Sequence, residues 1–232
     1  TVPKETVNMK IAVLRGPSAV GLIKMMDSKP SLGENVKVDY LIEQSADTLN
    51  AKLLSGEIEI ATIPTNSAAT LYNKGVAYQL VAMNTWGVMY VLTNGVVIDK
   101  WSDLKGKHID CAAKGAASDV VFRYLLSKNG IDPEKDVTLK YIATPAEQAQ
   151  LAVAGNSKIT VLPEPWVSTV LAKNKETKMA LDMQKEWTRL NGADVPFAQT
   201  CVVVKADFAS QHPDIISNFL KEYANSMDWV NK

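Results

Sequence analysis

The stretch LLSGEIEIATIPTNSAATL, residues 53–71, returns later in the chain as AVAGNSKITVLPEPWVSTVL, residues 152–171. At an offset of 99 residues, the glycine and the first proline of the two copies align. In each copy an apolar run precedes the proline, and a segment with helical spacing of its apolar residues follows it. Each copy therefore predicts a helix that ends at a glycine, a buried strand, a turn containing proline and a second helix.

A second pair of segments repeats at the same offset. KIAVLRGPSAVGLIKMM, residues 10–26, aligns with HIDCAAKGAASDVVFRYLL, residues 108–126. Further strands are predicted at 36–42 and 137–143, so each half alternates strands with helices, a pattern typical of parallel sheets with right-handed crossovers. Two copies are too few for a solenoid. The expected fold class is therefore α/β, with two Rossmann-like lobes.

Two strand-like segments, 84–94 and 196–205, fit neither repeat as helices. We expect them to cross between the lobes as a two-stranded hinge. The expected lobes, with a ligand cleft between them, are 1–88 with 199–232, and 89–198.

Composition excludes several classes of protein. The chain has 232 residues, is 47% hydrophobic, and balances 25 Lys and Arg against 25 Asp and Glu, so no basic surplus indicates nucleic acid binding. No apolar run reaches the roughly 20 residues that span a bilayer. With two histidines, two cysteines and no CxxC pattern, the sequence predicts neither a metal site nor a cofactor. Cys111 and Cys201 lie in strand-like runs, and we expect two buried, unpaired thiols.

Four equivalent turns join a strand to a helix, and we call them the corners: Arg15–Ser18, Pro64–Ser67, Lys114–Ser118 and Pro163–Trp166. In open α/β sheets, ligands bind beyond the carboxyl ends of strands. The first backbone N–H groups of a helix bind anionic or carbonyl oxygens without a charged side chain. The hydroxyl and amide side chains at the corners either contact a ligand or cap their own helices, and both interpretations remain open.

Several corner residues suggest the character of a ligand. The prolines around Glu164 make a stiff turn, and its carboxylate either faces the ligand or interacts with the helix dipole. Trp86 and Trp166 either cover opposite faces of a planar group or pack at the hinge and in the core. Arg15 and Lys114 occupy matching positions, where they either neutralise an anionic ligand or are solvated surface charges.

A search for catalytic motifs is negative. The sequence contains no GxSxG, HExxH, P-loop or GxGxxG pattern. The only visible acid–base set is Glu164 with Asp119 or Lys114. Binding without turnover is therefore expected. The alternative is an enzyme on the same fold, and a regulator's effector domain ranks last because no helix-turn-helix segment is present.

The repeats, with GEIEIATIPTNSAATLYNKG, WSDLKGKHI and LPEPWVSTVLAK, resemble the substrate-binding proteins of ABC importers. The similar branch includes nitrate, sulfonate, taurine and thiamine-pyrimidine binders, and the resemblance covers nearly the whole chain. It implies a type II periplasmic-binding-protein fold that closes on one small molecule and delivers it to a membrane permease. The enzyme alternative likewise has relatives on this fold, in menaquinone and pyrimidine synthesis. The resemblance also implies a periplasmic or extracellular, membrane-anchored location, with an export signal or lipoprotein anchor removed before Thr1.

Carried over position by position, the ligand loops of that family fall on the corners and on Trp86. The candidate ligand-binding residues are Arg15, Gly16, Pro17, Ser18, Thr65, Asn66, Trp86, Lys114, Gly115, Ala116, Ser118, Glu164 and Trp166. Because arginine is scarce at the corners, a planar, neutral or weakly anionic ligand is expected rather than nitrate or a sulfonate. Family members usually continue with further C-terminal helices, so lobe one is expected to be incomplete at Lys232. A protein that opens and closes around its cleft is expected to work as a monomer.

Overall fold

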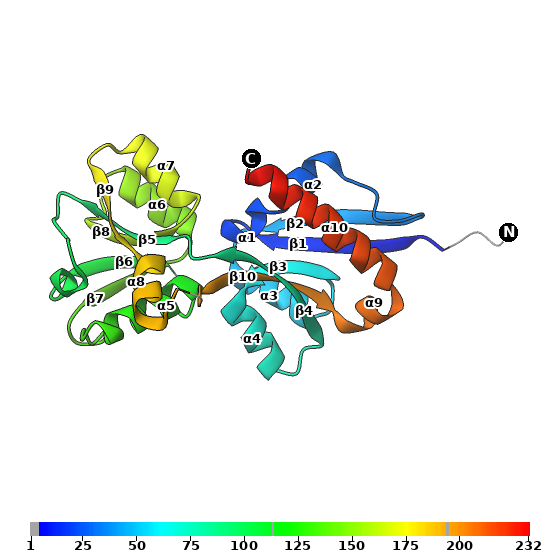
Figure 1. The fold of residues 1–232 in the computed structure, drawn as a ribbon, viewed down its shortest axis with the longest axis horizontal. Coiled ribbons are helices and arrows are strands. Elements are labelled where there is room, and N and C mark those ends of the chain that lie inside the picture. Colours follow the sequence, from blue (N-terminus) through cyan, green and yellow to red (C-terminus); the bar gives the residue numbers. More distant parts are fainter. Residues whose placement is uncertain (1–4, 113, 194) are drawn as a thin grey trace. The chain divides into compact units, whose positions relative to one another are not determined.

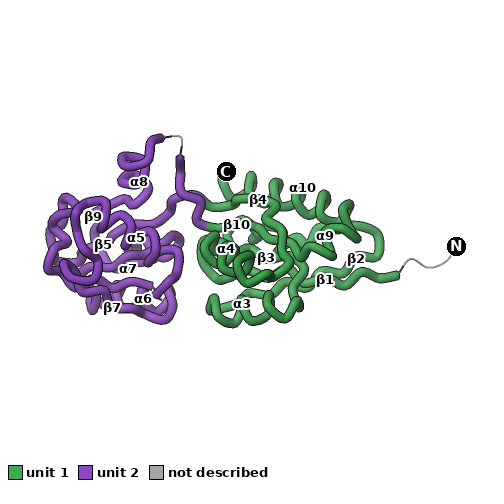
Figure 2. The backbone as a smooth tube through the Cα atoms, turned by 90° about the horizontal axis from the view of Figure 1, so that it is seen from below, with its two compact units in different colours: residues 1–85, 200–232 green, residues 86–199 purple. Residues whose placement is uncertain are grey.

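The computed structural model describes residues 5–112, 114–193 and 195–232. The chain forms two compact units (Figure 2). Unit 1 comprises residues 1–85 and 200–232, and unit 2 comprises residues 86–199. Each unit is an α/β body with one five-stranded sheet.

The sheet of unit 1 has the order β2-β1-β3-β10-β4. Its strands are β1 (Val7–Leu14), β2 (Val36–Glu43), β3 (Ile60–Pro64), β4 (Tyr78–Trp86) and β10 (Ala198–Lys205). β1 pairs in parallel with both β2 and β3, whereas β10 runs antiparallel to β3, with Thr200 opposite Pro64. The carboxyl ends of β1 and β3 therefore lie side by side.

Helices cover both faces of the unit 1 sheet (Figure 1). Its helices are α1 (Pro17–Val20), α2 (Ile23–Ser28), α3 (Ala46–Leu54), α4 (Thr65–Asn73), α9 (Ala206–Gln211) and α10 (Pro213–Val230). Residues of β1 alternate between the two cores, since Ile11 and Val13 pack towards Phe219 of α10, and Ala12 packs towards Leu49 of α3. This period of two is the signature of a strand buried on both faces.

The sheet of unit 2 has the matching order β7-β6-β8-β5-β9. Its strands are β5 (Met89–Asn94), β6 (His108–Ala112), β7 (Thr138–Ile142), β8 (Ile159–Pro163) and β9 (Thr177–Asp182). Its helices are η1 (Trp101–Leu104, a 3₁₀ turn), α5 (Ala117–Lys128), α6 (Pro145–Val153), α7 (Trp166–Lys173) and α8 (Met183–Asn191). One core, around Phe122, packs α5 and α8 on the sheet, and a second core, around Leu162, packs α6 and α7.

The predicted repeat is confirmed in the elements that carry it. α6 and β8 begin and end 99 residues after α3 and β3. The two helices also stop in the same way, because Gly56 and Gly155 have φ of 70° and 74°, in the left-handed region that glycine tolerates.

The strands of the repeat pair in parallel, as their alternation with helices predicts, but each sheet also contains an antiparallel strand. β5 runs antiparallel to β8, and β10 runs antiparallel to β3. Each of these strands enters a sheet directly from the other unit's part of the chain, without the crossover helix that a parallel neighbour needs. The two α/β units are therefore built on mixed sheets.

The longest helix among residues 5–112, 114–193 and 195–232 is α10, and no helix there is both long and apolar enough to cross a membrane. Cys111 and Cys201 are both buried and free, as the sequence predicts.

Candidate ligand-binding site

The two corners of unit 1 are adjacent, because β1 and β3 pair in parallel. A hydrogen bond links the first corner to β3, since the hydroxyl of Thr62, in the middle of β3, donates to the Ser18 carbonyl oxygen at 2.8 Å. The Ser18 hydroxyl donates to the Leu14 carbonyl oxygen at 2.7 Å and is buried. Ser18 therefore stabilises the end of its own strand, which is a third role beside the two that the sequence leaves open.

The Arg15–Ser18 corner needs glycine at its second position. Gly16 is buried and has φ of 138° and ψ of −147°, a conformation that side chains rarely adopt, and Pro17 follows in the first turn of α1. Arg15 is exposed, and its Nη1 donates to the Gln44 side-chain oxygen at 3.2 Å. At the second corner, Thr65 and Asn66 are half-buried at the start of α4.

A buried carboxylate holds the Lys114–Ser118 corner of unit 2. Asp119 is 3% exposed, and its Oδ2 accepts a hydrogen bond from the Gly115 backbone N–H at 2.8 Å. Its Oδ1 accepts a hydrogen bond from the Tyr141 hydroxyl at 2.9 Å. Burial, and then the bond to Asp119, raise the pKa of Tyr141 to about 12. Lys114 is exposed, Ala116 precedes the first turn of α5, and the Ser118 side chain is buried.

The Pro163–Trp166 corner is held by Glu164. Its carboxylate accepts hydrogen bonds from the backbone N–H and the hydroxyl of Ser168, each at 3.0 Å. Glu164 therefore caps the first turn of α7, which agrees with the helix-dipole interpretation. The Glu164 backbone N–H donates to the Val88 carbonyl oxygen at 2.9 Å, so the chain just after Trp86 lies beside this corner.

The two tryptophans both belong to unit 2. Trp86 is 48% exposed, whereas Trp166 is half-buried and packs against the core around Leu162. Trp166 therefore has a packing role. Trp86 remains an exposed aromatic surface at the entry to unit 2.

The four corners share a feature of their helices. The residues that precede the first helical turn are Gly16, Pro64, Ala116 and Pro165. None of these side chains carries an oxygen that could cap the helix. By contrast, Ser45, Thr144 and Asp182 cap α3, α6 and α8 through side-chain oxygens. The N-cap side chain therefore does not cap any of the four corner helices, although Glu164, one residue earlier, caps the first turn of α7.

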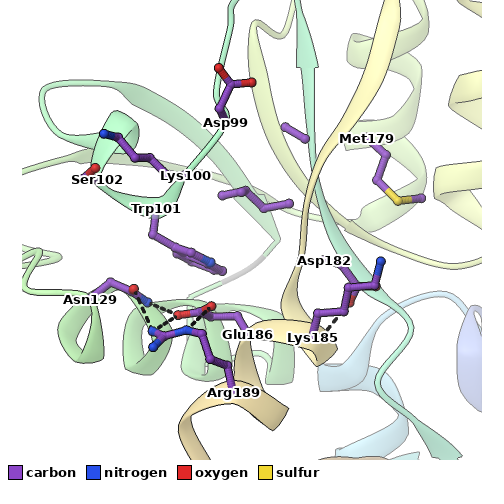
Figure 3. Close-up of a pocket in the computed structure, with 12 residues that line it drawn as sticks. Asp99, Lys100, Trp101, Ser102, Asn129, Met179, Asp182, Lys185, Glu186 and Arg189 are labelled. Carbon is purple, nitrogen blue, oxygen red and sulfur yellow. Dashed lines mark hydrogen bonds and ion pairs between the residues drawn. The ribbon is translucent and has the colours of Figure 1, made fainter.

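A cavity of about 650 Å³ lies elsewhere in unit 2, between η1, β9 and α8 (Figure 3). Its base is an ion pair in which the Arg189 Nε donates to the Glu186 carboxylate at 2.9 Å, and Asn129 donates to the same carboxylate at 2.7 Å. The hydrogen bond from Arg189 lowers the pKa of Glu186. No predicted site residue lines this cavity, and its Glu186–Arg189 ion pair joins α8 to Asn129 at the end of α5. Size alone therefore does not make it the ligand site.

The structure brings the candidates together in two groups. Unit 1 holds Arg15–Ser18 with Thr65 and Asn66, and unit 2 holds Trp86 with the Gly115 and Glu164 corners. Among the residues that the structure describes, no group of three or more His, Cys, Asp or Glu side chains could hold a metal. Sequence reasoning considered Asp119 only as an acid and missed Tyr141 and Ser168. Asp119, with its hydrogen bonds to Gly115 and Tyr141, forms a clamp that holds this corner. Its place in the first turn of α5, three residues after the N-cap position, is the signal that could have identified the clamp.

Comparison with known proteins places the chain in a family. The model of the NMT1-like family matches residues 3–232. YtlA of Bacillus subtilis (strain 168), which is named for a binding function, is 24% identical over 201 residues, which are 85% of this chain and 58% of YtlA. The chain thus spans less than two thirds of that curated relative.

Two solved structures are similar over almost the whole chain. An ABC transporter protein of Parabacteroides distasonis is 26% identical, with a TM-score of 0.71, over 97% of this chain and 78% of that protein. The periplasmic aliphatic sulphonate binding protein SsuA of Escherichia coli is 16% identical, with a TM-score of 0.76, over 96% of this chain and 73% of that protein. The second likeness shows the type II periplasmic-binding-protein fold, and the match to the family model shows that this chain belongs to the NMT1-like family.

Proposed function

We propose that the chain is the solute-binding component of an ABC importer and binds one small molecule through the four corners. The observation that carries the proposal is the similarity of almost the whole chain to an ABC transporter protein and to a periplasmic sulphonate binding protein, together with candidate residues that lie in both units where strands lead into helices. Oxygen atoms of a ligand would accept hydrogen bonds from first-turn N–H groups of these helices. A ligand that contacts both units would favour a closed state through its differential contacts.

The proposed ligand is small, and neutral or weakly anionic. Arg15 and Lys114 are the cationic side chains at the corners, and both are exposed. An exposed cation contributes little to the affinity for a charged group. Backbone N–H groups at the start of a helix bind carbonyl or weakly charged oxygens without help from a cationic side chain. The exposed Trp86 ring would cover a planar part of the ligand.

The hydrogen bonds of the two corner carboxylates support binding without turnover. Asp119 accepts hydrogen bonds from Gly115 and Tyr141, and Glu164 accepts two from Ser168. Both candidate acid–base groups therefore have structural partners within their own corners. The enzyme alternative would have to break these bonds before either group could transfer a proton.

The partner and the location follow from the same proposal. A membrane permease would receive the ligand, and the protein would work outside the cytoplasm. The names of YtlA and of the two solved proteins support this assignment, since each names a binding or ABC transport component.

The first experiment identifies the ligand. Native mass spectrometry of the purified protein would detect a bound small molecule. A thermal-shift screen of sulfonates, nitrate, pyrimidines, aromatic acids and amino-acid derivatives would then find compounds that stabilise the folded state. A compound that is chemically converted on incubation would contradict binding without turnover.

A matched pair of proline variants tests the role of the helix starts. Ala117→Pro removes the first N–H of α5, and Ala116 before it has ψ of 159°, which suits a residue preceding proline. Ala46→Pro makes the same change at α3, which Ser45 caps. We expect Ala117→Pro to weaken binding of the identified compound by about fivefold to tenfold, the effect of one lost hydrogen bond, and Ala46→Pro to leave it unchanged. Equal affinities in a folded Ala117→Pro variant would contradict the role of the helix starts.

A further inference from the structure

The chain passes between the two units twice (Figure 2). The first crossing lies between Thr85 and Trp86, at the end of β4, and the second lies between Gln199 and Thr200, near the start of β10. β4 and β10 are also neighbours in the unit 1 sheet. When two bodies move relative to each other, a few residues at the ends of such elements absorb the change in φ and ψ. The contacts on either side of the crossings decide which residues these are.

On the unit 1 side, a hydrogen bond between side chains joins the two crossing strands, and we call it the unit 1 tie. The Thr200 hydroxyl of β10 donates to the Asn84 side-chain oxygen of β4 at 2.7 Å, and both residues are buried. Thr200 also pairs with Pro64 in the ladder between β10 and β3. Burial raises the pKa of Tyr223 in α10 to about 12, and the Asn84 amide beside its hydroxyl acts in the opposite direction. Asn84 and Thr200 are therefore held by the body of unit 1.

On the unit 2 side, a backbone hydrogen bond joins the same two segments, and we call it the unit 2 tie. The Gly87 N–H donates to the Phe197 carbonyl oxygen at 3.2 Å. Gly87 is buried, and a Cβ there would lie 2.6 Å from the side-chain oxygen of Gln184 and 3.0 Å from its Cβ, so the chain lies close against α8. The buried Phe197 ring contacts the Trp187 ring, with centroids 5.4 Å apart. Gly87 and Phe197 are therefore held by the body of unit 2.

The two ties have the same spacing on both strands. Asn84 and Gly87 are three residues apart, as are Phe197 and Thr200, so two residues lie between the ties on each strand. Movement at a tie would break a buried hydrogen bond, whereas the residues between the ties need only change φ and ψ. We call these the hinge residues: Thr85, Trp86, Ala198 and Gln199.

We propose that bending between the two units is confined to the four hinge residues, and that Asn84 and Thr200 are positioning residues that hold the unit 1 end of this hinge. Each tie joins both strands, so the strands bend together. Trp86 is a hinge residue, so the direction of its exposed side chain changes when the hinge bends. In the proposed function the same ring covers the ligand, and contact with a ligand would then act directly on the hinge. This last step rests on the proposed function, whereas the hinge itself does not.

The test measures the distance between the units and needs no ligand. Spin labels on Tyr72→Cys in unit 1 and Val97→Cys in unit 2 report this distance, because both positions are exposed. The natural cysteines, Cys111 and Cys201, are buried and should not take up the label. Double electron–electron resonance then gives the distribution of distances in the whole chain.

A matched pair of variants changes one buried threonine each. Thr200→Val removes the unit 1 tie, and about fivefold more molecules should have distances outside the main peak of the labelled parent, the effect of one lost hydrogen bond. Thr62→Val removes the 2.8 Å bond to the Ser18 carbonyl oxygen in the same unit and should leave the distribution unchanged. An unchanged distribution in a folded Thr200→Val variant would overturn the proposal. Equal broadening in both variants would also overturn it, because a general loss of stability in unit 1 would then explain the result.

Hydrogen exchange of single amides, measured by NMR on the wild-type chain, needs no variant. The Gly87 amide, in the unit 2 tie, should exchange at least about tenfold more slowly than the amides of Trp86 and Gln199, because bending opens only the hinge residues. Gln199 is buried, so surface exposure alone would not make its amide exchange rapidly. Equal protection of Gly87 and Gln199 would mean that the chain bends elsewhere, which contradicts the proposal.

Discussion

Asp119 offers a direct test of how the Lys114–Ser118 corner is held. Its two carboxylate oxygens accept one hydrogen bond each, from the Gly115 N–H at 2.8 Å and from the Tyr141 hydroxyl at 2.9 Å. The side chain is 3% exposed, so water cannot easily replace either bond. We therefore expect Asp119→Ala and Tyr141→Phe to interact strongly in a double-mutant cycle.

The magnitudes follow from the number of bonds each variant breaks. Tyr141→Phe removes one hydrogen bond to a charged group and should cost about 1.5 kcal/mol of unfolding free energy. Asp119→Ala removes both bonds and leaves two donors without this acceptor, which should cost about 3 kcal/mol. In the double variant the Tyr141 donor is already absent, so the cost should stay near 3 kcal/mol, and the coupling energy should be about 1.5 kcal/mol.

Asp119→Asn is the matched control, because it keeps the shape of the side chain and removes its charge. The amide can turn so that its oxygen accepts from the Gly115 N–H and its nitrogen donates to the Tyr141 hydroxyl, which both donates and accepts. We expect this variant to lose only about 1 kcal/mol, the difference between charge-assisted and neutral hydrogen bonds.

Urea unfolding followed by tryptophan fluorescence suits this cycle, because most of the tryptophans report on the unit that contains Asp119. Unit 2 contains Trp86, Trp101, Trp166 and Trp187, and unit 1 contains Trp229. A Trp229→Phe background isolates the transition of unit 2 and allows two-state fitting for that unit. Additive costs within about 0.5 kcal/mol would refute the clamp.

Three further predictions concern buried groups. Gln148 is fully buried, and its Nε2 lies 2.7–2.9 Å from three acceptor oxygens of β6 and β8. Gln148→Ala should therefore lower the free energy of unfolding in urea by about 3 kcal/mol. Gln148→Leu should lower it less, because leucine keeps most of the side-chain volume. Burial raises the pKa of Cys201 to about 11 and raises that of Cys111, so a thiol reagent at about pH 8 should label both only after unfolding, and rapid labelling of the folded chain would contradict this. A Cβ at Gly21 would lie 2.6 Å from the Tyr223 hydroxyl of α10, so Gly21→Ala should lower the stability of unit 1 by about 1–3 kcal/mol, seen in Trp229 fluorescence.

The repeat made much of the fold predictable, because the two copies must satisfy the same packing rules. The offset of 99 residues predicted the positions of α3, β3, α6 and β8 from glycine, proline and apolar spacing. The failures of prediction lie in segments outside the repeat. Gly87, with φ of 74°, divides the strand-like segment 84–94 between β4 and β5, and the sequence pattern did not predict this division. β9, with the sequence TKMALD, is too short and too polar to be distinguished from a loop by periodicity.

The sequence could not predict the hydrogen-bond partners of the corner residues, because hydrogen bonds depend on the positions of atoms within a few ångströms of one another in the folded chain. Ser18 and Glu164 are candidate ligand contacts in the sequence, Asp119 is a candidate acid–base group, and each side chain is hydrogen-bonded at its own corner. This observation moves the expected source of ligand affinity from side chains to the backbone. A side chain that fixes its corner prevents the first helical turn from rearranging, so the N–H groups there need little ordering when a ligand binds. Variants of the clamps should therefore weaken binding through the position of the backbone, even though the clamp side chains need not touch the ligand.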